Sequence, residues 1–354
     1  MQALIEFRSR FEPCLEAYIA SKVATYSSLT EDRDIANLIA YTSKLIQGGG
    51  KRIRPFLTWL MYQGLAGKKQ SALLEASIAL EVFHVFGLMH DDIIDRGTDR
   101  HGIPTVHLAV AKRLKQQKRF GDVHHIGEGQ AILLGDLLFS WSAEIMAKTT
   151  VFGEKNHRLA QQRFFNMVDE VVIGQMLDVD IMTRSVADMQ RIDEKMRLKT
   201  ASYSFIRPLQ IGAAFAGTNS RIDRFCEAIG LSLGLAFQIQ DDYLDLTADP
   251  KTLKKTVFSD LADHQHTIFT QFIFDQGTSA QKKMLKSILG TPLTEKDRPR
   301  ILDLFESSGA FAYGKKQIDG YFDQAARILQ TIQLKPIAKN GLANLIAYLR
   351  QRQV

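Results

Sequence analysis

The sequence predicts an all-α protein, a bundle of long helices around a central pocket. Alternating β-branched runs joined by two-residue turns, which are typical of sheets, are almost absent from its 354 residues. Glycine and proline stand mostly between long segments in which apolar residues recur with a helical period. Residues 72–90 and 228–240 are apolar on nearly every side, as are helices in a protein interior. We predict a single domain over residues 1–354.

The segments between these breaks are predicted to be helices because their apolar positions are three or four residues apart. Pro104, Pro208, Pro250, Pro292 and Pro336 mark breaks between segments. In chain order, the expected helices cover residues 3–25, 31–47, 51–66, 70–96, 104–117, 128–149, 154–181, 186–200, 202–217, 221–246, 260–275, 278–288, 294–308, 310–331 and 335–351.

The composition is that of an ordinary globular protein, with 45% apolar and 24% charged residues. A net charge of +6 suits an anionic small molecule as well as a nucleic acid, so the charge alone selects neither. Cys14 and Cys226 are too few for a disulfide framework or a structural zinc site. Charged residues interrupt the N-terminal segment and every long apolar window, so we expect no signal peptide, no membrane span and a cytoplasmic location.

Two acidic runs, Asp91–Asp95 and Asp241–Asp245, end the two most apolar stretches and share the pattern Asp-Asp-x-x-Asp. The first and fifth positions lie on one helix face, one turn apart. Carboxylates held this close resist joint ionisation, and a divalent cation removes that conflict. Oxygen ligands without cysteine point to Mg²⁺, which is commonly shared with substrate phosphates. The sequence therefore predicts two magnesium-binding walls that face each other across a diphosphate.

Basic residues at four places are candidates to bind such a diphosphate. Residues 48–50 are three glycines that let the backbone approach an anion, and Lys51 and Arg54 follow at a helix start. Cations are unfavourable there, which favours a functional interpretation over a flexible turn. The other three places are Arg100-His101, Lys199-Thr200 and Lys254-Lys255. Each alone is a weak signal, but together with the acidic runs they indicate an anion site.

Two polar stretches interrupt the helical pattern. Residues 112–127 are basic and punctuated by glycine, and we interpret them as a solvated helix end and loop, with an anion- or partner-binding surface as the alternative. Residues 247–259 follow the second acidic run directly, so they are a candidate lid.

The chain resembles the trans-isoprenyl diphosphate synthases, or polyprenyl synthetases, of the short-chain geranylgeranyl and farnesyl type. The matching segments, in the order of the family, are GGGKRIRP at 48–55, Glu81, His84, HDDIID at 90–95, Arg100, GIPTVH at 102–107, AILLGD at 131–136, GQMLD at 174–178, Lys199-Thr200, FQIQDDYLD at 237–245, Lys255 and Asp260. The resemblance implies an isoprenoid synthase fold, usually homodimeric. It also implies the condensation of isopentenyl diphosphate with dimethylallyl, geranyl or farnesyl diphosphate, three Mg²⁺ ions per active site, and no nucleic-acid partner.

The resemblance also implies a role for each matching side chain. Asp91, Asp95 and Asp241 would coordinate Mg²⁺. Lys51, Arg54, His84 and the neighbouring His101 would bind isopentenyl diphosphate. Arg100, Lys199, Thr200, Gln238 and Lys255 would bind the allylic diphosphate, and Phe237 would lie beside the developing carbocation. The catalytic set would be Asp91, Asp95, Arg100, Lys199, Asp241 and Lys255.

Three positions depart from the family pattern. His101 replaces the second of two arginines, Lys254-Lys255 replaces a Gly-Lys pair in the lid, and Gln265 replaces a further lid lysine. These changes leave open a non-catalytic or regulatory synthase subunit, and the shared first motif leaves open a class I terpene cyclase. Six intact aspartates favour an active synthase.

The length of the product is predicted from the residues that precede the first acidic run. Phe86 and Phe83 stand five and eight residues before Asp91, about 7 and 12 Å away at a rise of ~1.5 Å per residue. A bulky ring there should stop chain growth at C15 to C20, and Gly87 leaves extra room beside it. We expect C20 with C15 as the alternative, and plain core packing is the other interpretation of both rings.

Overall fold

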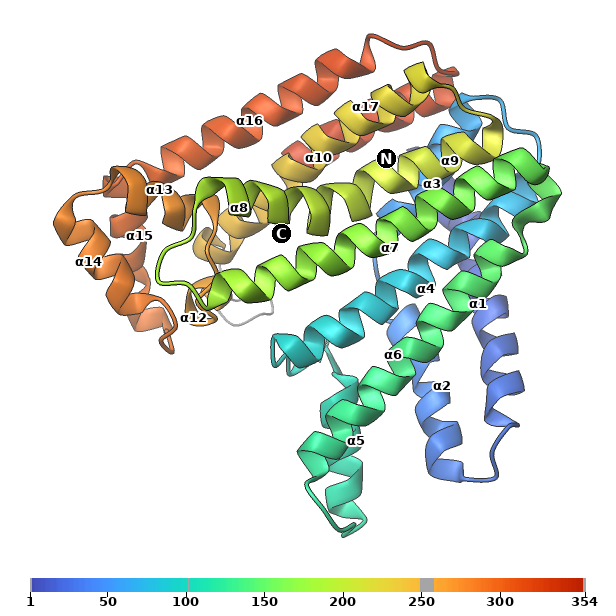
Figure 1. The fold of residues 1–354 in the computed structure, drawn as a ribbon, viewed down its shortest axis with the longest axis horizontal. Helices are drawn as coiled ribbons and strands as arrows, with labels where there is room; N and C mark the ends of the chain where they lie inside the picture. The colour runs from blue at the N-terminus through green and yellow to red at the C-terminus, as the bar shows by residue number, and fades with distance from the viewer. Residues whose placement is uncertain (1, 101, 249–257, 353–354) are drawn as a thin grey trace.

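The computed structural model describes residues 2–100, 102–248 and 258–352, and long helices make up almost all of them (Figure 1). The predicted all-α class is confirmed. In the described part of the chain the helices are α1 (Gln2–Ser27), α2 (Arg33–Gln47), α3 (Ile53–Gly64), α4 (Gln70–Ile94), α5 (Val106–Gln116), α6 (Val123–Ala147), η1 (Thr149–Phe152), α7 (Glu154–Met182), α8 (Met189–Lys195), η2 (Met196–Ile206), α9 (Arg207–Ala216), α10 (Ser220–Thr247), α12 (Ser259–Ala262), α13 (Ile268–Gln276), α14 (Ser279–Ile288), η3 (Glu295–Asp297), α15 (Arg298–Ser307), α16 (Ala310–Leu329) and α17 (Pro336–Arg350). A short antiparallel ribbon, β1 (Asp99–Arg100) with β2 (Ile103–Pro104), is the only sheet in these residues.

Three predicted helix boundaries were wrong, and local chemistry explains each. The break expected near residue 201 is absent, because η2 is a π-helix that joins α8 to α9 without interruption. A π-helix accommodates a proline ring that would clash in a regular helix, and Pro208 follows directly. The predicted helix 260–275 is two helices, since His264 has a left-handed φ of 58° and Thr267 caps α13. The helix predicted over 128–149 starts earlier as α6, because the Asp122 side chain caps its first turn.

Two glycines bring the helices around η2 into close contact. A Cβ on Gly234 of α10 would lie 2.2 Å from the Cα of Ala201, and one on Gly174 of α7 would lie 2.5 Å from the backbone N of Lys199. Only glycine permits such an approach. A glycine inside a buried helix predicts either close packing or a needed gap. At Gly234 the structure shows close packing, which holds Lys199 and Thr200 between α7 and α10.

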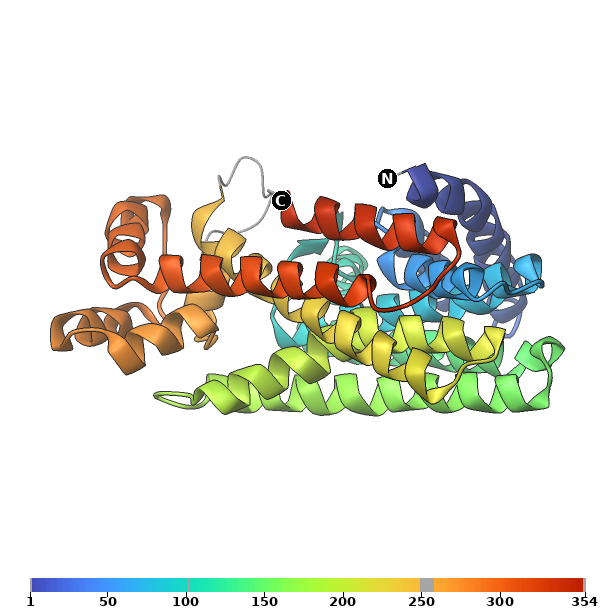
Figure 2. The same ribbon diagram turned by 90° about the horizontal axis from the view of Figure 1, so that it is seen from above.

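The bundle is elongated, and its two ends differ (Figures 1 and 2). Helices α13, α14 and α15 form one end, whereas α5, the first turns of α6 and the loop between α1 and α2 project elsewhere (Figure 1). Among the described helices, only α4 is long and apolar enough to cross a membrane, and 67% of its most apolar window is buried inside the protein.

Candidate active site

The two acidic runs converge on one cavity of about 800 Å³ between α4, α7, η2 and α10. Asp91 at the end of α4 and Asp241 near the end of α10 both line this cavity, which we call the main cavity. Phe83, Phe86 and Phe237 also line it. Carboxylates and aromatic rings therefore border the same space, which matches the shape of a ligand with a charged head and an apolar tail.

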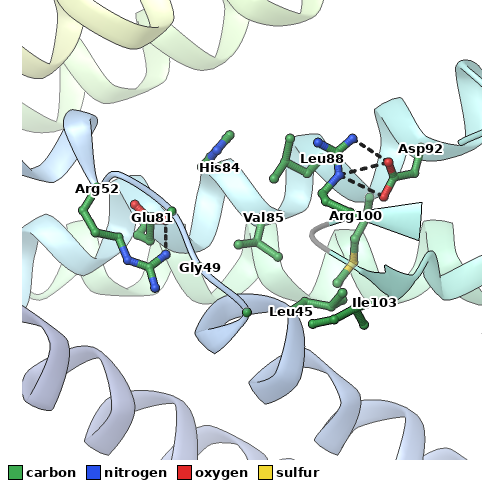
Figure 3. A pocket seen from close by; sticks show the side chains of 13 residues that line it. Leu45, Gly49, Arg52, Glu81, His84, Val85, Leu88, Asp92, Arg100 and Ile103 are labelled. Carbon is green, nitrogen blue, oxygen red and sulfur yellow. Dashed lines mark hydrogen bonds and ion pairs between the residues drawn. The ribbon is translucent and has the colours of Figure 1, made fainter. Parts of the chain in front are cut away.

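The three aspartates of the first run point to different places. Asp91 lines the main cavity, and Asp95 lines a separate polar chamber of about 140 Å³. Asp92 is buried, and its Oδ1 accepts a hydrogen bond of 2.5 Å from Nη2 of Arg100 (Figure 3). The Arg100 guanidinium, predicted to bind the allylic diphosphate, is thus held by Asp92 in this structure.

The aspartates of the second run are divided in the same way. Asp241 forms an ion pair with Arg352, which comes from the end of the chain. Asp242 accepts a hydrogen bond of 2.8 Å from Gln238. Asp245 accepts hydrogen bonds from the backbone and the hydroxyl group of Ser259, so it anchors the start of α12. Only Asp241 of this run lines the main cavity.

Burial strongly perturbs these carboxyl groups. It raises the pKa of Asp91, although Lys199 and Arg100 oppose that shift. Loss of water around the carboxyl also raises the pKa of Asp95 to about 6, and the pKa of Asp242 to about 6. No three such acidic, histidine or cysteine side chains among the described residues stand close enough to hold a metal ion by themselves. An ion bound here would need additional ligands from a substrate, which is the usual coordination of Mg²⁺.

Lys199 projects from η2 toward an aspartate whose role the sequence did not reveal. Its Nζ lies 2.5 Å from Oδ2 of Asp178, and Nζ of Lys195 lies 3.0 Å from Oδ1 of the same carboxylate. Burial would raise the pKa of Asp178, but the two ammonium groups hold it below its usual range. Asp178 belongs to the GQMLD segment, and the spacing of Lys195 and Lys199, one helical turn, was the available signal for their convergence.

The polar chamber contains the position of one family departure. Gln265, which stands where a lysine was expected, lines the chamber with Asp95, Asp178 and Lys199. Nζ of Lys195 lies 3.5 Å from the side-chain oxygen of Gln265. A lysine from α8 therefore brings a positive charge to this place. The other two departures, His101 and Lys254-Lys255, lie outside the described residues.

Thr200, Gln238 and Asp242 form a chain of hydrogen bonds beside this chamber. The Thr200 hydroxyl donates a hydrogen bond of 2.5 Å to the Gln238 side chain, which donates in turn to Asp242. Phe237 precedes Gln238, and the Arg352 guanidinium lies 4.5 Å from the centroid of the Phe237 ring. Arg352 thus touches both Asp241 and Phe237.

Three of the four residues expected to bind isopentenyl diphosphate are described by the structure, and they lie in different settings. His84 lines both the main cavity and a small cavity of about 50 Å³, and its Nδ1 lies 2.7 Å from the Tyr203 hydroxyl. Arg54 lines the main cavity, donates to Ser204 at 2.8 Å, and covers the Tyr203 ring. Lys51 lines neither cavity and lies 5.7 Å from the ring centroid of Tyr348. Tyr203 joins the first two residues, and the sequence did not indicate it.

The glycine loop before α3 is fixed by Arg52 rather than by the residues expected to bind a ligand. Nη1 of Arg52 lies 2.6 Å from Oε1 of Glu81 (Figure 3). Nη2 of Arg52 donates to the carbonyl of Ile46 at 2.7 Å. Glu12 contributes a second carboxylate at 3.2 Å. Gly49 and Gly50 adopt φ angles of 126° and 141° that other residues rarely take. Arg52 therefore joins the loop to α4 and α1.

The expected floor residues belong to a larger aromatic cluster. The Phe83 and Phe86 rings lie 5.2 Å apart, and the Phe139 ring of α6 lies 5.6 Å from Phe86. Phe164 of α7 lies 5.8 Å from Phe83. Phe83 is fully buried, whereas Phe86 is partly exposed toward the cavity. A Cβ on Gly87 would meet its first neighbour only at 4.0 Å, which leaves the extra room that the sequence suggested.

Comparison with known proteins agrees with this arrangement. The polyprenyl synthetase family profile matches residues 36–304. The chain is 30% identical over 331 residues to the geranylfarnesyl diphosphate synthase of Aeropyrum pernix, with 92% of this chain and 95% of that protein covered. It is 32% identical over 266 residues to the geranylgeranyl diphosphate synthase of Sulfolobus acidocaldarius, with 75% of each chain covered.

A solved structure shares the fold along the whole chain. The geranylgeranyl pyrophosphate synthase of Corynebacterium glutamicum, complexed with isoprenyl diphosphate and magnesium, superposes with a TM-score of 0.89 at 24% identity, with 99% of both chains covered. The helical architecture is therefore that of the isoprenoid synthases. With the family match over most of its length, the chain belongs to the polyprenyl synthetase family of prenyltransferases.

Proposed function

We propose that this protein condenses isopentenyl diphosphate with an allylic diphosphate to form a trans prenyl diphosphate, most readily the C20 product. The main cavity carries this proposal, because it joins the two acidic runs to an aromatic cluster in one space. Relatives named as C20 and C25 synthases support a product of this size. Phe86 beside Gly87 favours C20 over C25, and C15 is the shorter alternative.

The carboxylates fit magnesium ions that are shared with the substrate. Asp91, Asp95 and Asp241 would hold them, and three ions per site is the expected number. Burial raises the pKa of Asp91 and Asp95, so an added cation would relieve an existing conflict. A structure related by fold contains magnesium with isoprenyl diphosphate. Bound Mg²⁺ would supply positive charge that stabilises the departing diphosphate.

The protein's own residues would position the two substrates. Lys199, Thr200 and Gln238 would bind the allylic diphosphate with Arg100 and Lys255, while Arg54, His84, Lys51 and His101 would bind isopentenyl diphosphate. The allylic carbon–oxygen bond breaks, the isopentenyl double bond attacks the carbocation beside Phe237, and a proton leaves to the released diphosphate. The apolar lining excludes water that would quench the cation.

Product analysis with purified protein tests this proposal. Dimethylallyl, geranyl and farnesyl diphosphates would each be supplied with isopentenyl diphosphate and Mg²⁺. A C20 diphosphate from each primer supports the proposal. Cyclic hydrocarbons would indicate a terpene cyclase, and no turnover with any primer would indicate a regulatory subunit.

Replacing Phe86 by alanine should lengthen the main product by at least one C5 unit. The change removes a ring from the main cavity, where Phe139 lies 5.6 Å behind it. Chromatography of the products after dephosphorylation measures the length. Phe165→Ala is the matched control, because Phe165 lies on α7 with 41% of its surface exposed and does not line the main cavity. An unchanged length would place the floor elsewhere.

Magnesium should raise the melting temperature more at pH 7.5 than at pH 5. The folded-state pKa of Asp95, one of the assigned metal ligands, is about 6, above that of an unfolded aspartate. A raised carboxyl pKa contributes stability at low pH that is lost as pH rises toward 6, so the ionised cluster weakens the metal-free fold at neutral pH. A bound cation should recover on the order of a few degrees there. Calorimetry with Mg²⁺ or with K⁺ at equal ionic strength measures the change in melting temperature. An equal increase with Mg²⁺ at both pH values would contradict the expectation.

We further propose that the protein is a homodimer. Helices α6 and α7 expose large apolar side chains that do not line the main cavity, among them Leu133 at 65% and Ile173 at 50%. A surface of this kind is typical of an interface between protein chains. Leu133→Asp with Ile173→Asp should therefore shift the protein from dimer to monomer in sedimentation velocity. A wild-type chain that sediments as a monomer would refute the proposal.

A further inference from the structure

We infer that the projecting end of α5 and the turn that follows it, residues 112–121, dock on a membrane surface rich in anionic phospholipid. We call this segment the α5 tip. The inference goes beyond the proposed reaction and does not depend on it, since binding to a membrane is measurable without substrate. Figure 1 shows the segment projecting from the body of the bundle, where a flat surface could reach it.

The α5 tip is strongly basic, and four of its five cations are exposed, whereas Arg113 is half-buried and donates to the carbonyl of Asp34. Lys112, Arg113, Lys115, Lys118 and Arg119 occupy residues 112–119 with no acidic residue among them. The three lysines form no ion pair with any residue that the structure describes. Arg119 lies 3.4 Å from Asp34, yet 61% of its side chain stays exposed. Clusters of cations at this density are attracted to anionic lipid headgroups.

An exposed aromatic ring stands beside these cations. Phe120 is 97% exposed, more than any other large apolar side chain in the described residues. The turn that presents it has a left-handed backbone at Lys118 and Gly121, with φ angles of 52° and 96°. This turn ends α5 and directs the chain back into α6. Phe120 therefore lies in the turn, outside both helices. A ring held in water beside cations is typical of an anchor that inserts among lipid headgroups.

A second apolar residue favours a lipid over a nucleic acid. Leu29, in the loop between α1 and α2, is 75% exposed, and this loop also projects away from the bundle (Figure 1). The Arg119–Asp34 ion pair joins the start of α2 to the α5 tip. An aliphatic side chain gains free energy in hydrocarbon but offers no ring for a base to stack on. Basic charge with two apolar anchors predicts reversible docking rather than permanent insertion.

Sedimentation of the full chain with lipid vesicles tests the inference. Vesicles of phosphatidylglycerol with phosphatidylcholine should bind the protein, and vesicles of phosphatidylcholine alone should not. Phe120→Ser should weaken vesicle binding about tenfold, because the variant has no aromatic ring to transfer from water into the lipid. Lys115→Glu with Lys118→Glu should abolish binding, and 0.5 M salt should weaken it as screening predicts.

A charge-matched control lies on α14, at the end of the bundle and away from the α5 tip (Figure 1). Lys283 and Lys286 on α14 are exposed, and Lys283→Glu with Lys286→Glu changes the net charge equally but should leave vesicle binding intact. If both double variants lost vesicle binding equally, the inference would be overturned. It would also be overturned if the Phe120→Ser variant bound vesicles as tightly as the wild type. Binding of a single-stranded oligonucleotide in place of vesicles would also overturn it, and so would conversion of a dimer to monomer by Phe120→Ser, which would make the α5 tip a subunit contact. A melting curve for each variant confirms that it is folded.

Discussion

Replacing Asp91 and Asp95 together by asparagine is expected to lower kcat/KM by at least about 10³-fold. Asparagine keeps the size of each side chain but removes the negative charge that a magnesium ion requires. Loss of charge stabilisation in a transition state is worth several kcal/mol, and each ~1.4 kcal/mol is a factor of ten in rate. A discontinuous assay with radiolabelled isopentenyl diphosphate would cover this range.

The same double variant should keep its fold or gain stability. Burial raises the pKa of both carboxyls, so the metal-free protein is stabilised when their charges are removed. Asp319→Asn with Asp323→Asn is the matched control, since these aspartates are also one turn apart on a helix, but they pair with Arg350 on an exposed surface. Surface pairs of this kind contribute little. More than a tenth of wild-type activity in the Asp91/Asp95 variant would contradict the assigned metal ligands.

The sequence predicted the convergence of the two acidic runs because the acidic pattern and the apolar stretch before it can both be read from one short segment. Each run follows an apolar stretch, and burial of that stretch brings its end to the centre of the bundle. The close packing at Gly234 was predictable for the same reason, since a glycine inside a buried helix costs about 1 kcal/mol unless a neighbour needs the space.

The different contacts of the aspartates within each run were not predictable, because they depend on partner residues from other helices and strands. Asp92 turns to Arg100 of β1, and Asp245 turns to Ser259, the last residue of the candidate lid stretch 247–259. The π-helix at 196–206 is followed by Pro208 and lies between two helices that approach it closely at Gly174 and Gly234. No single segment contains that information.

Arg352 shows how far apart such partners can be in the sequence. It pairs with Asp241, 111 residues earlier, and its backbone carbonyl accepts a hydrogen bond of 3.1 Å from Gln240. Arg352 thus lies against the second acidic run. Arg352 contacts Oδ1 of Asp241, and a carboxylate has a second oxygen that can coordinate a cation at the same time.

Arg52→Met is expected to cost about 3–5 kcal/mol of unfolding free energy, the usual loss when one member of a buried ion pair is removed. The reason is that Glu81 would remain buried, with only 4% of its side chain exposed and its close cationic partner gone. The loop before α3 would lose its attachment to α4 through Glu81, and also the hydrogen bond from Arg52 to the carbonyl of Ile46 at the end of α2. Urea denaturation measures the change as a lower midpoint at an unchanged slope.

A second substitution separates the buried charge from the lost packing. Arg52→Met with Glu81→Leu removes both charges, and apolar replacement of a whole buried pair is often neutral, so the double variant should recover much of the stability that the single variant loses. Arg158→Met breaks a pair with Glu154 in which both side chains are about three-quarters exposed, and it should cost less than about 1 kcal/mol. A double variant less stable than Arg52→Met alone would show that the ion pair itself, and not the unpaired Glu81, stabilises the loop. That outcome would make the glycine loop depend on charge rather than on shape.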